Sequence, residues 1–207
     1  MASLGDSRVV MYGGMDINGN DHNDTWIFTA PTTKDAAGTW VRAKDGPGAR
    51  DSHAMASLGD SRVVMYGGGD NNNDLKDTWI FNGKDATWTQ TTDGPSARAY
   101  HAMASLGDLR IVMYGGQDNK NNVINTNVIN NVINDAWMFF GHNGTWVQLA
   151  TSMLPRYYHA MSSIGPDKIV AFGGQVIDQT NLRSKAKLAD DVWIMQGGCP
   201  EGTSGLI

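Results

Sequence analysis

The chain has 207 residues, with 16 lysines and arginines, 21 aspartates and glutamates, and one cysteine. It is long enough to bury a sizeable core, and its mildly acidic charge argues against nucleic acid as the main partner. A single cysteine excludes an internal disulfide and a cysteine-based zinc cluster. No apolar run approaches the roughly 20 residues of a membrane helix, and the first residues do not resemble a signal peptide. We therefore expect a cytoplasmic protein with no membrane insertion.

A segment of about 50 residues recurs along the chain, and repeats of this length are typical of solenoids and propellers. Three copies begin at Arg50, Arg98 and Arg156, and each continues to a histidine and then to a Gly-Gly pair. A shorter copy begins at Met1, which aligns with Met55, and it lacks the arginine and histidine positions. We expect one domain made of four units and a tail, with bounds near 1–49, 50–97, 98–155, 156–196 and 197–207.

Each unit is predicted to form four short strands, and the second copy shows the first two most clearly. Its residues 53–58 are mostly small, which suits the crowded inner strand of a tapering sheet. A Gly-Asp turn follows and predicts a hairpin. Residues 62–66 are apolar without alternation, which indicates burial on both faces between neighbouring sheets. A Gly-Gly pair then ends this second strand.

The third and fourth strands are marked by tryptophans. An aspartate stands two positions before each tryptophan of the third strand, at Trp26, Trp79, Trp137 and Trp193. We expect these four side chains to be largely buried at matching positions. A second tryptophan opens the fourth strand and is followed by polar residues, which is typical of an exposed outer strand. These residues are Trp40, Trp88 and Trp146.

The Gly-Gly pair, the spaced tryptophan and the Arg-x-x-His opening of the next unit resemble the kelch repeat. A tryptophan in both the third and the fourth strand is similar to the kelch repeats of galactose-oxidase-like propellers. The resemblance covers about residues 1–196. It implies an all-β fold, a β-propeller with one blade of four antiparallel strands per repeat. It implies no particular substrate, because a fold does not determine a function.

The two ends of the chain bear on whether the propeller closes. Kelch propellers usually have more than four blades and share one blade between the chain ends. The last unit has no second tryptophan, and residues 197–207 make a poor fourth strand. We therefore expect four recognisable blades that form a partial propeller, with possible self-association through the uncovered terminal blades. The alternative is a closed ring in which residues 203–207 supply a makeshift strand.

The candidate contact residues lie where one blade leads to the next. The loops there share a rim with the loops between the second and third strands, which vary most in length, and such loops carry binding surfaces. Positions that repeat in register favour a frame role, as for the arginines and histidines, whereas the residues between them differ. Tyrosine offers a large contact area at low entropic cost. The predicted partner-binding residues are Tyr100, Tyr157 and Tyr158, with Arg50, Arg98 and Arg156 beside them.

The predicted function is a non-catalytic scaffold that binds a protein partner through this rim, with no cofactor and no metal. The alternative is a propeller that binds or modifies a carbohydrate. A galactose-oxidase-like enzyme needs a cysteine–tyrosine crosslink and histidine ligands, whereas Cys199 lies outside the repeats and the aligned histidines are spread one per repeat. A sialidase-like enzyme needs a glutamate beside a tyrosine, and Glu201 is the only glutamate. The Asp/Asn-rich loop at 16–21 lacks the glycine position of an EF-hand.

Overall fold

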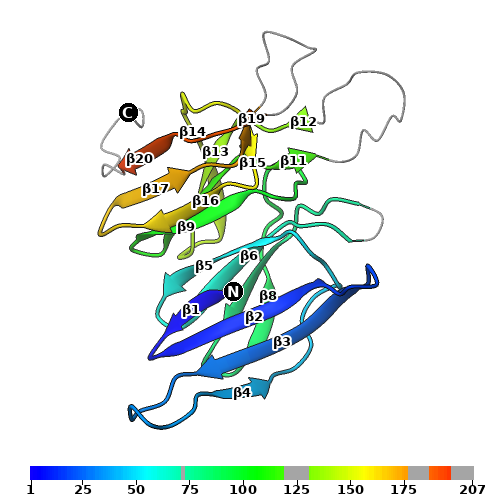
Figure 1. The fold of residues 1–207 in the computed structure, drawn as a ribbon, viewed down its shortest axis with the longest axis vertical. Helices are drawn as coiled ribbons and strands as arrows, with labels where there is room; N and C mark the ends of the chain where they lie inside the picture. The colour runs from blue at the N-terminus through cyan, green and yellow to red at the C-terminus, as the bar shows by residue number, and fades with distance from the viewer. Residues whose placement is uncertain (71–72, 119–130, 177–186, 197–207) are drawn as a thin grey trace.

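The computed structural model describes residues 1–70, 73–118, 131–176 and 187–196, which form strands and loops without a helix (Figure 1). Four antiparallel sheets, here called blades, follow one another along the chain. Blade 1 comprises β1 (Ala2–Gly5), β2 (Arg8–Met15), β3 (Asp21–Thr29) and β4 (Thr39–Arg42). Blade 2 comprises β5 (Ala54–Gly59), β6 (Arg62–Tyr66), β7 (Thr78–Asn82) and β8 (Thr87–Gln90).

Blade 3 comprises β9 (Ala102–Gly107), β10 (Arg110–Tyr114), β13 (Ala136–Phe140) and β14 (Thr145–Leu149). Blade 4 comprises β16 (Ala160–Ser163), β17 (Lys168–Phe172) and β20 (Val192–Gln196). The predicted all-β architecture of successive blades is therefore confirmed. The expected tail at 197–207, and with it the makeshift strand at 203–207, lies outside the described residues.

Two smaller sheets follow the Gly-Gly pairs, and the repeat pattern did not predict them. In one, β11 (Gln117–Asp118) pairs with β12 (Asn131–Val132). In the other, the three strands are β15 (Arg156–Tyr157), β18 (Gln175–Val176) and β19 (Lys187–Leu188). Both sheets join loop segments on the rim that carries the predicted contact residues.

The turn between the first two strands of blade 2 explains why Gly-Asp recurs there. Gly59, Asp60 and Ser61 have φ angles of 85°, 47° and 67°. Two consecutive non-glycine residues in the left-handed region form a type I′ hairpin, whose twist matches that of the flanking strands. Asp108 and Leu109 adopt the same conformation in blade 3, so the predicted hairpin turn is confirmed.

The second strand of a blade is central, and its side chains alternate between two neighbouring blades. In β6, Val63 packs toward blade 1 beside Leu4 and Val10. Val64 and Tyr66 point the other way and pack toward blade 3. All of these side chains are buried, which confirms the predicted burial on both faces. The core therefore consists of layers between successive blades.

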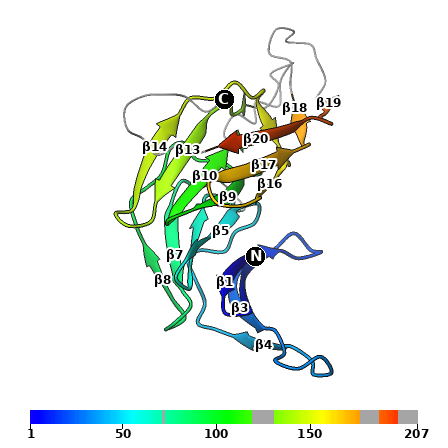
Figure 2. The same cartoon turned by 90° about the vertical axis from the view of Figure 1, so that its left-hand side faces the viewer.

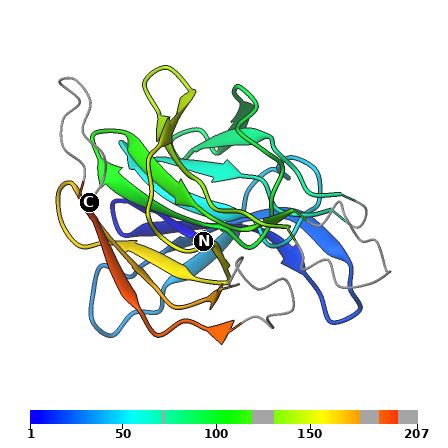
Figure 3. The same ribbon diagram turned by 90° about the horizontal axis from the view of Figure 1, so that it is seen from above.

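The inner strands pack side by side in the order β1, β5, β9 and β16, while β4, β8 and β14 lie at the periphery (Figure 2). In the described part of the chain, contacts run from blade 1 to blade 2, from 2 to 3 and from 3 to 4, and the blades do not close into a ring; Figure 3 gives the view from above. The outer strands are mostly exposed, as predicted. The blades thus form an open arc, the expected partial propeller.

The tryptophans of the third strands are only partly buried, whereas the sequence predicted that they would be largely buried. In β7 the fully buried aromatic residue is Phe81, two positions after Trp79. The indole N–H of Trp79 donates a hydrogen bond to the Asp77 carboxylate at 2.6 Å. Phe81 fills the layer between blades 1 and 2 with Leu4, Val10 and Val63, and Trp79 is not part of that cluster.

Candidate protein-binding rim

The arginine that opens each repeat lies inside its blade. Arg50 is 2% exposed and donates two hydrogen bonds to the Asp77 carboxylate, at 2.6 and 2.8 Å, and a third to the Gly67 carbonyl at 3.1 Å. The other two pairs have the same geometry: Arg98 with Asp135, and Arg156 with Asp191. Each arginine ties the end of the second strand to the start of the third. These bonds point inward, so the arginines are frame residues and the tyrosines are left as the candidate surface.

The aspartates of these pairs are shared with the tryptophans. Asp191 accepts hydrogen bonds from both Arg156 and the indole N–H of Trp193. The bonds from Arg156 are the main reason that the pKa of Asp191 falls to about 2. In blade 1, Trp26 donates to Asp24 in the same way. The recurrent Asp-x-Trp pattern therefore supplies the acceptor (Asp) and one of the two donors (Trp) of a three-residue frame, and the arginine is the other donor.

The histidine of each repeat is also part of the frame. His53, His101 and His159 lie edge-on to the tyrosine that precedes the Gly-Gly pair of a neighbouring blade, with ring centroids 5.5–5.6 Å apart. Burial lowers the pKa of His53 to about 3 and that of His159 to about 4, and it lowers the pKa of His101 well below its usual range. All three imidazoles are therefore neutral at pH 7.

The residue before each histidine has a left-handed backbone. The φ angles of Ser52, Tyr100 and Tyr158 are 52°, 59° and 57°, a region that bulky residues rarely occupy. The Tyr100 N–H donates to the Ser52 carbonyl at 3.0 Å, and the Tyr158 N–H donates to the Tyr100 carbonyl at 3.1 Å. Blades 2, 3 and 4 are thus linked by a relay of backbone hydrogen bonds at the rim.

This relay is held by backbone pairing just before it. Asp51 and Gly69 exchange two hydrogen bonds, and Ala99 and Gln117 do the same in the next blade. Tyr157 occupies this position in blade 4, where β15 pairs with β18. The inter-blade segment is therefore clamped against the residue that follows each Gly-Gly pair.

The structure brings the three predicted tyrosines together. The rings of Tyr100 and Tyr158 have centroids 4.4 Å apart, and those of Tyr157 and Tyr158 are 5.0 Å apart. Tyr157 is buried and donates its hydroxyl hydrogen bond to Gln175. Tyr158 is 56% exposed and Tyr100 is partly buried. Tyr157 thus supports a surface that Tyr100 and Tyr158 present, an arrangement that the sequence spacing alone could not reveal.

The Asp/Asn-rich loop of blade 1 is a local turn. The Asp16 carboxylate accepts hydrogen bonds from the N–H groups of Asn18 and Asn20 at 2.8 and 2.9 Å. Bonds from Asn20 are the main reason that the pKa of Asp16 falls to about 2. Within the described ranges, histidine, cysteine and acidic residues form no group of three that could hold a metal ion.

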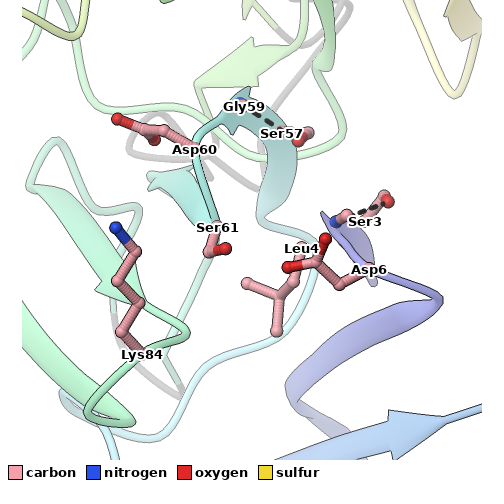
Figure 4. Close-up of a pocket in the computed structure, with 9 residues that line it drawn as sticks. Ser3, Leu4, Asp6, Ser57, Gly59, Asp60, Ser61 and Lys84 are labelled. Atoms are coloured by element: carbon pink, nitrogen blue, oxygen red, sulfur yellow. Dashed lines mark hydrogen bonds between the residues drawn. The ribbon is translucent and has the colours of Figure 1, made fainter.

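A cavity of about 340 Å³ lies on the opposite rim, between the first hairpins of blades 1 and 2 (Figure 4). Asp6 and Asp60 reach it from the hairpins, and Lys84 reaches it from the turn between β7 and β8. In the next repeat, Leu109 stands at the position of Ser61 and packs against the core. The cavity therefore reflects a small residue at one turn, and the predicted contact tyrosines do not line it.

Comparison with known proteins agrees with this frame. The KLHDC2/KLHL20/DRC7 Kelch-repeats domain matches residues 1–174. The F-box/kelch-repeat protein At1g51550 of Arabidopsis thaliana is 30% identical over 82 residues, which are 38% of this chain and 17% of that relative. Only a minor part of the relative is therefore covered. No helix in the described part of the chain is long and apolar enough to cross a membrane. The domain match and the repeated Arg–Asp–Trp frame show that the chain belongs to the kelch-repeat family.

Proposed function

We propose that this domain is a binding scaffold for a protein partner and has no catalytic activity of its own. Kelch-repeat domains generally serve as protein-interaction scaffolds. The proposed contact surface is the rim formed by the loops between second and third strands and the loops between blades, with Tyr100 and Tyr158 at its centre. The contact between the tilted rings of Tyr100 and Tyr158, across blades 3 and 4, is the observation that carries this proposal.

The repeat itself argues that these two tyrosines are not needed for folding. The equivalent residue of blade 2 is Ser52, which adopts the same left-handed conformation and continues the same backbone relay. A bulky residue in that conformation is strained by about 1–3 kcal/mol, and such strain is concentrated at functional sites. An exposed tyrosine also presents a large contact area with few rotatable bonds.

A peptide-display selection tests this proposal and needs no identified partner. Peptides that bind the 207-residue chain are selected, and their affinities are then measured for the Tyr100→Ala/Tyr158→Ala variant. We expect binding to fall about tenfold or more, because aromatic residues dominate most binding surfaces. The melting temperature should change by only a few degrees, because the tyrosines lie outside the blade cores.

The matched control is Trp40→Ala, which removes an exposed aromatic residue from the outer strand β4. This variant should bind the selected peptides with unchanged affinity. The proposal is wrong if the double tyrosine variant binds the selected peptides as tightly as the original chain does. It is also wrong if Trp40→Ala lowers their affinity as much as the double tyrosine variant does. Selection of glycans in a parallel array, with no peptide ligands, would favour the carbohydrate-binding alternative.

A further inference from the structure

Carboxylates gather at the junction of blades 1 and 2, on the rim whose backbone relay continues to Tyr100 and Tyr158. Arg50 donates its backbone N–H to the His22 carbonyl at 3.1 Å, which brings the start of β3 next to the inter-blade segment. Asp51 is then paired with Gly69 through two backbone bonds, at 3.0 and 2.9 Å. The start of β3 and two separate loops thereby place Asp21, Asp51 and Asp70 at one part of the rim.

These carboxylates interact electrostatically with one another and with the tyrosines. Burial first, and then the charges of Asp51 and Asp70, raise the pKa of Asp21. Burial first, the neighbouring tyrosines next and Asp51 last raise the pKa of Tyr158 to about 12. Asp51 directly precedes Ser52, whose carbonyl accepts the Tyr100 N–H, so it lies beside the backbone relay that carries both tyrosines. A rim that carries several carboxylates favours the approach of a cation.

The arginine beneath this surface does not neutralise it. Arg50 directly precedes Asp51, but its guanidinium binds the Asp77 carboxylate inside the blade. One oxygen of Asp21, Oδ1, is shielded from solvent and has no hydrogen-bond partner among the described residues. Burying an acceptor in this way is unfavourable unless a donor reaches it. Because Oδ1 of Asp21 is shielded from solvent, it is the negative charge of the carboxylates that selects the partner group, and a group with N–H donors fits that charge.

We infer that the Tyr–Asp surface, defined as Asp21, Asp51, Asp70, Tyr100 and Tyr158, binds a segment of the partner protein that carries lysine or arginine. The inference rests on the proposed function and specifies the chemistry of the partner at that rim. The aromatic faces attract a cation through their quadrupole, and the carboxylates accept its hydrogen bonds. The net charge of −5 attracts a basic segment from a distance.

Two fluorescein-labelled peptides test this inference by fluorescence anisotropy. One alternates arginine with glycine over nine residues, and the other has glutamate at the arginine positions. The arginine peptide should bind at least about tenfold more tightly than the glutamate peptide, and added salt should weaken its binding. Asp51→Asn and Tyr158→Ala should each lower the affinity for the arginine peptide about threefold or more. Tyr158→Phe keeps the aromatic ring and should leave this affinity unchanged.

The control is Asp35→Asn, which removes an exposed carboxylate from the turn between β3 and β4 on the opposite rim. Equal losses for Asp35→Asn and Asp51→Asn would show nonspecific attraction and overturn the inference, as would equal binding of both peptides or no binding of the arginine peptide. Display-selected peptides that are acidic or neutral, yet depend on Tyr100 and Tyr158, would overturn the cationic preference and leave the proposed rim function standing. Selected peptides whose binding does not depend on Tyr100 or Tyr158 would overturn the cationic preference and the proposed rim function together.

Discussion

At the residue scale, the fold depends on buried arginine–aspartate pairs, in which neither partner can be removed alone without a large loss of stability. Arg98 is fully buried, and its guanidinium binds both Asp135 and the Gly115 carbonyl. Removing one member of such a pair leaves the other charge buried without a partner. The repeated pairs are therefore strict requirements of the fold, although they add little net stability over apolar residues of the same size.

Arg98→Ala should lower the free energy of unfolding by about 3–5 kcal/mol, because it leaves the Asp135 carboxylate without its charged partner. Urea unfolding measures this loss. The control is Arg42→Ala, since Arg42 pairs with Asp45 at an exposed position and should lose about 1 kcal/mol or less. The double variant Arg98→Ala/Asp135→Ala should lose less than the sum of its single variants. Equal losses for Arg98→Ala and Arg42→Ala would refute the frame role.

The buried histidines predict a loss of stability in mild acid. The pKa of His53 is about 3 and that of His159 about 4 in the folded chain, against an ordinary value of 6.5. The unfolded chain therefore binds more protons as pH falls below 6.5, and each histidine favours unfolding by about 2 kcal/mol at pH 5. The destabilisation stops growing below the folded pKa.

Urea unfolding at pH 7 and pH 5 measures this effect. His159→Gln should reduce the difference between the two pH values by about 2 kcal/mol, whereas His142→Gln, at an exposed position, should not change it. A free energy of unfolding that is the same at both pH values would contradict neutral burial of these imidazoles.

At the element scale, the tryptophans of the fourth strands join neighbouring blades. Trp146 lies on β14 of blade 3, and its indole N–H donates to the Thr78 hydroxyl on β7 of blade 2 at 3.1 Å. Its ring packs against Tyr66 and Phe139. Trp88 makes the same contact with Thr25 of blade 1. An outer strand that is mostly exposed thus contributes one residue to the layer between blades.

Trp146→Ala should cost about 3–5 kcal/mol of unfolding free energy, as expected for a large aromatic residue packed between blades. The matched control is Trp40→Ala, because Trp40 occupies the same position in blade 1 but is 48% exposed. That variant should lose about 1 kcal/mol or less. Chemical unfolding of both variants measures the two losses of unfolding free energy. If the two losses are the same, the second tryptophan does not hold neighbouring blades together.

The sequence predicted the elements well where composition and spacing determine them. The apolar run at 62–66 and the Gly-Asp turn before it correctly indicated a buried strand and a tight hairpin. The pairing of Asp51 with Gly69 was not predictable, because a two-residue contact leaves no periodic pattern. An arginine that recurs in register is compatible with a surface or a buried position, so only the structure shows Arg98 bound to Asp135. The left-handed backbone of Tyr158 likewise has no signature, since serine occupies the equivalent position of blade 2.

At the scale of the whole molecule, the two terminal blades differ from the inner ones in what covers them. Phe172 of blade 4 is 53% exposed, whereas the equivalent Tyr114 of blade 3 is fully buried by the next blade. Ile164 is exposed in the same way, although its equivalent Leu106 is buried. Phe28 on blade 1 is only partly buried, in contrast to Phe139 of blade 3.

These two faces are complementary, because the far face of each inner blade packs against the near face of the next. The far face of blade 4 and the near face of blade 1 offer the same kinds of apolar residue. Apolar patches of this kind on a soluble protein tend to recruit partners. A contact between unlike faces adds copies head to tail. We therefore predict that this 207-residue chain self-associates through its terminal blades.

Multi-angle light scattering of the purified chain measures this association, and the average mass should rise with concentration. Phe172→Glu and Ile194→Lys place a charge on the uncovered face of blade 4, so each should shift the chain toward the monomer. The control is Val147→Lys, which charges an exposed position on the outer strand β14 and should leave the association unchanged. A monodisperse monomer of the original chain with a cooperative melt would show that the terminal faces need no partner, and the prediction would be wrong.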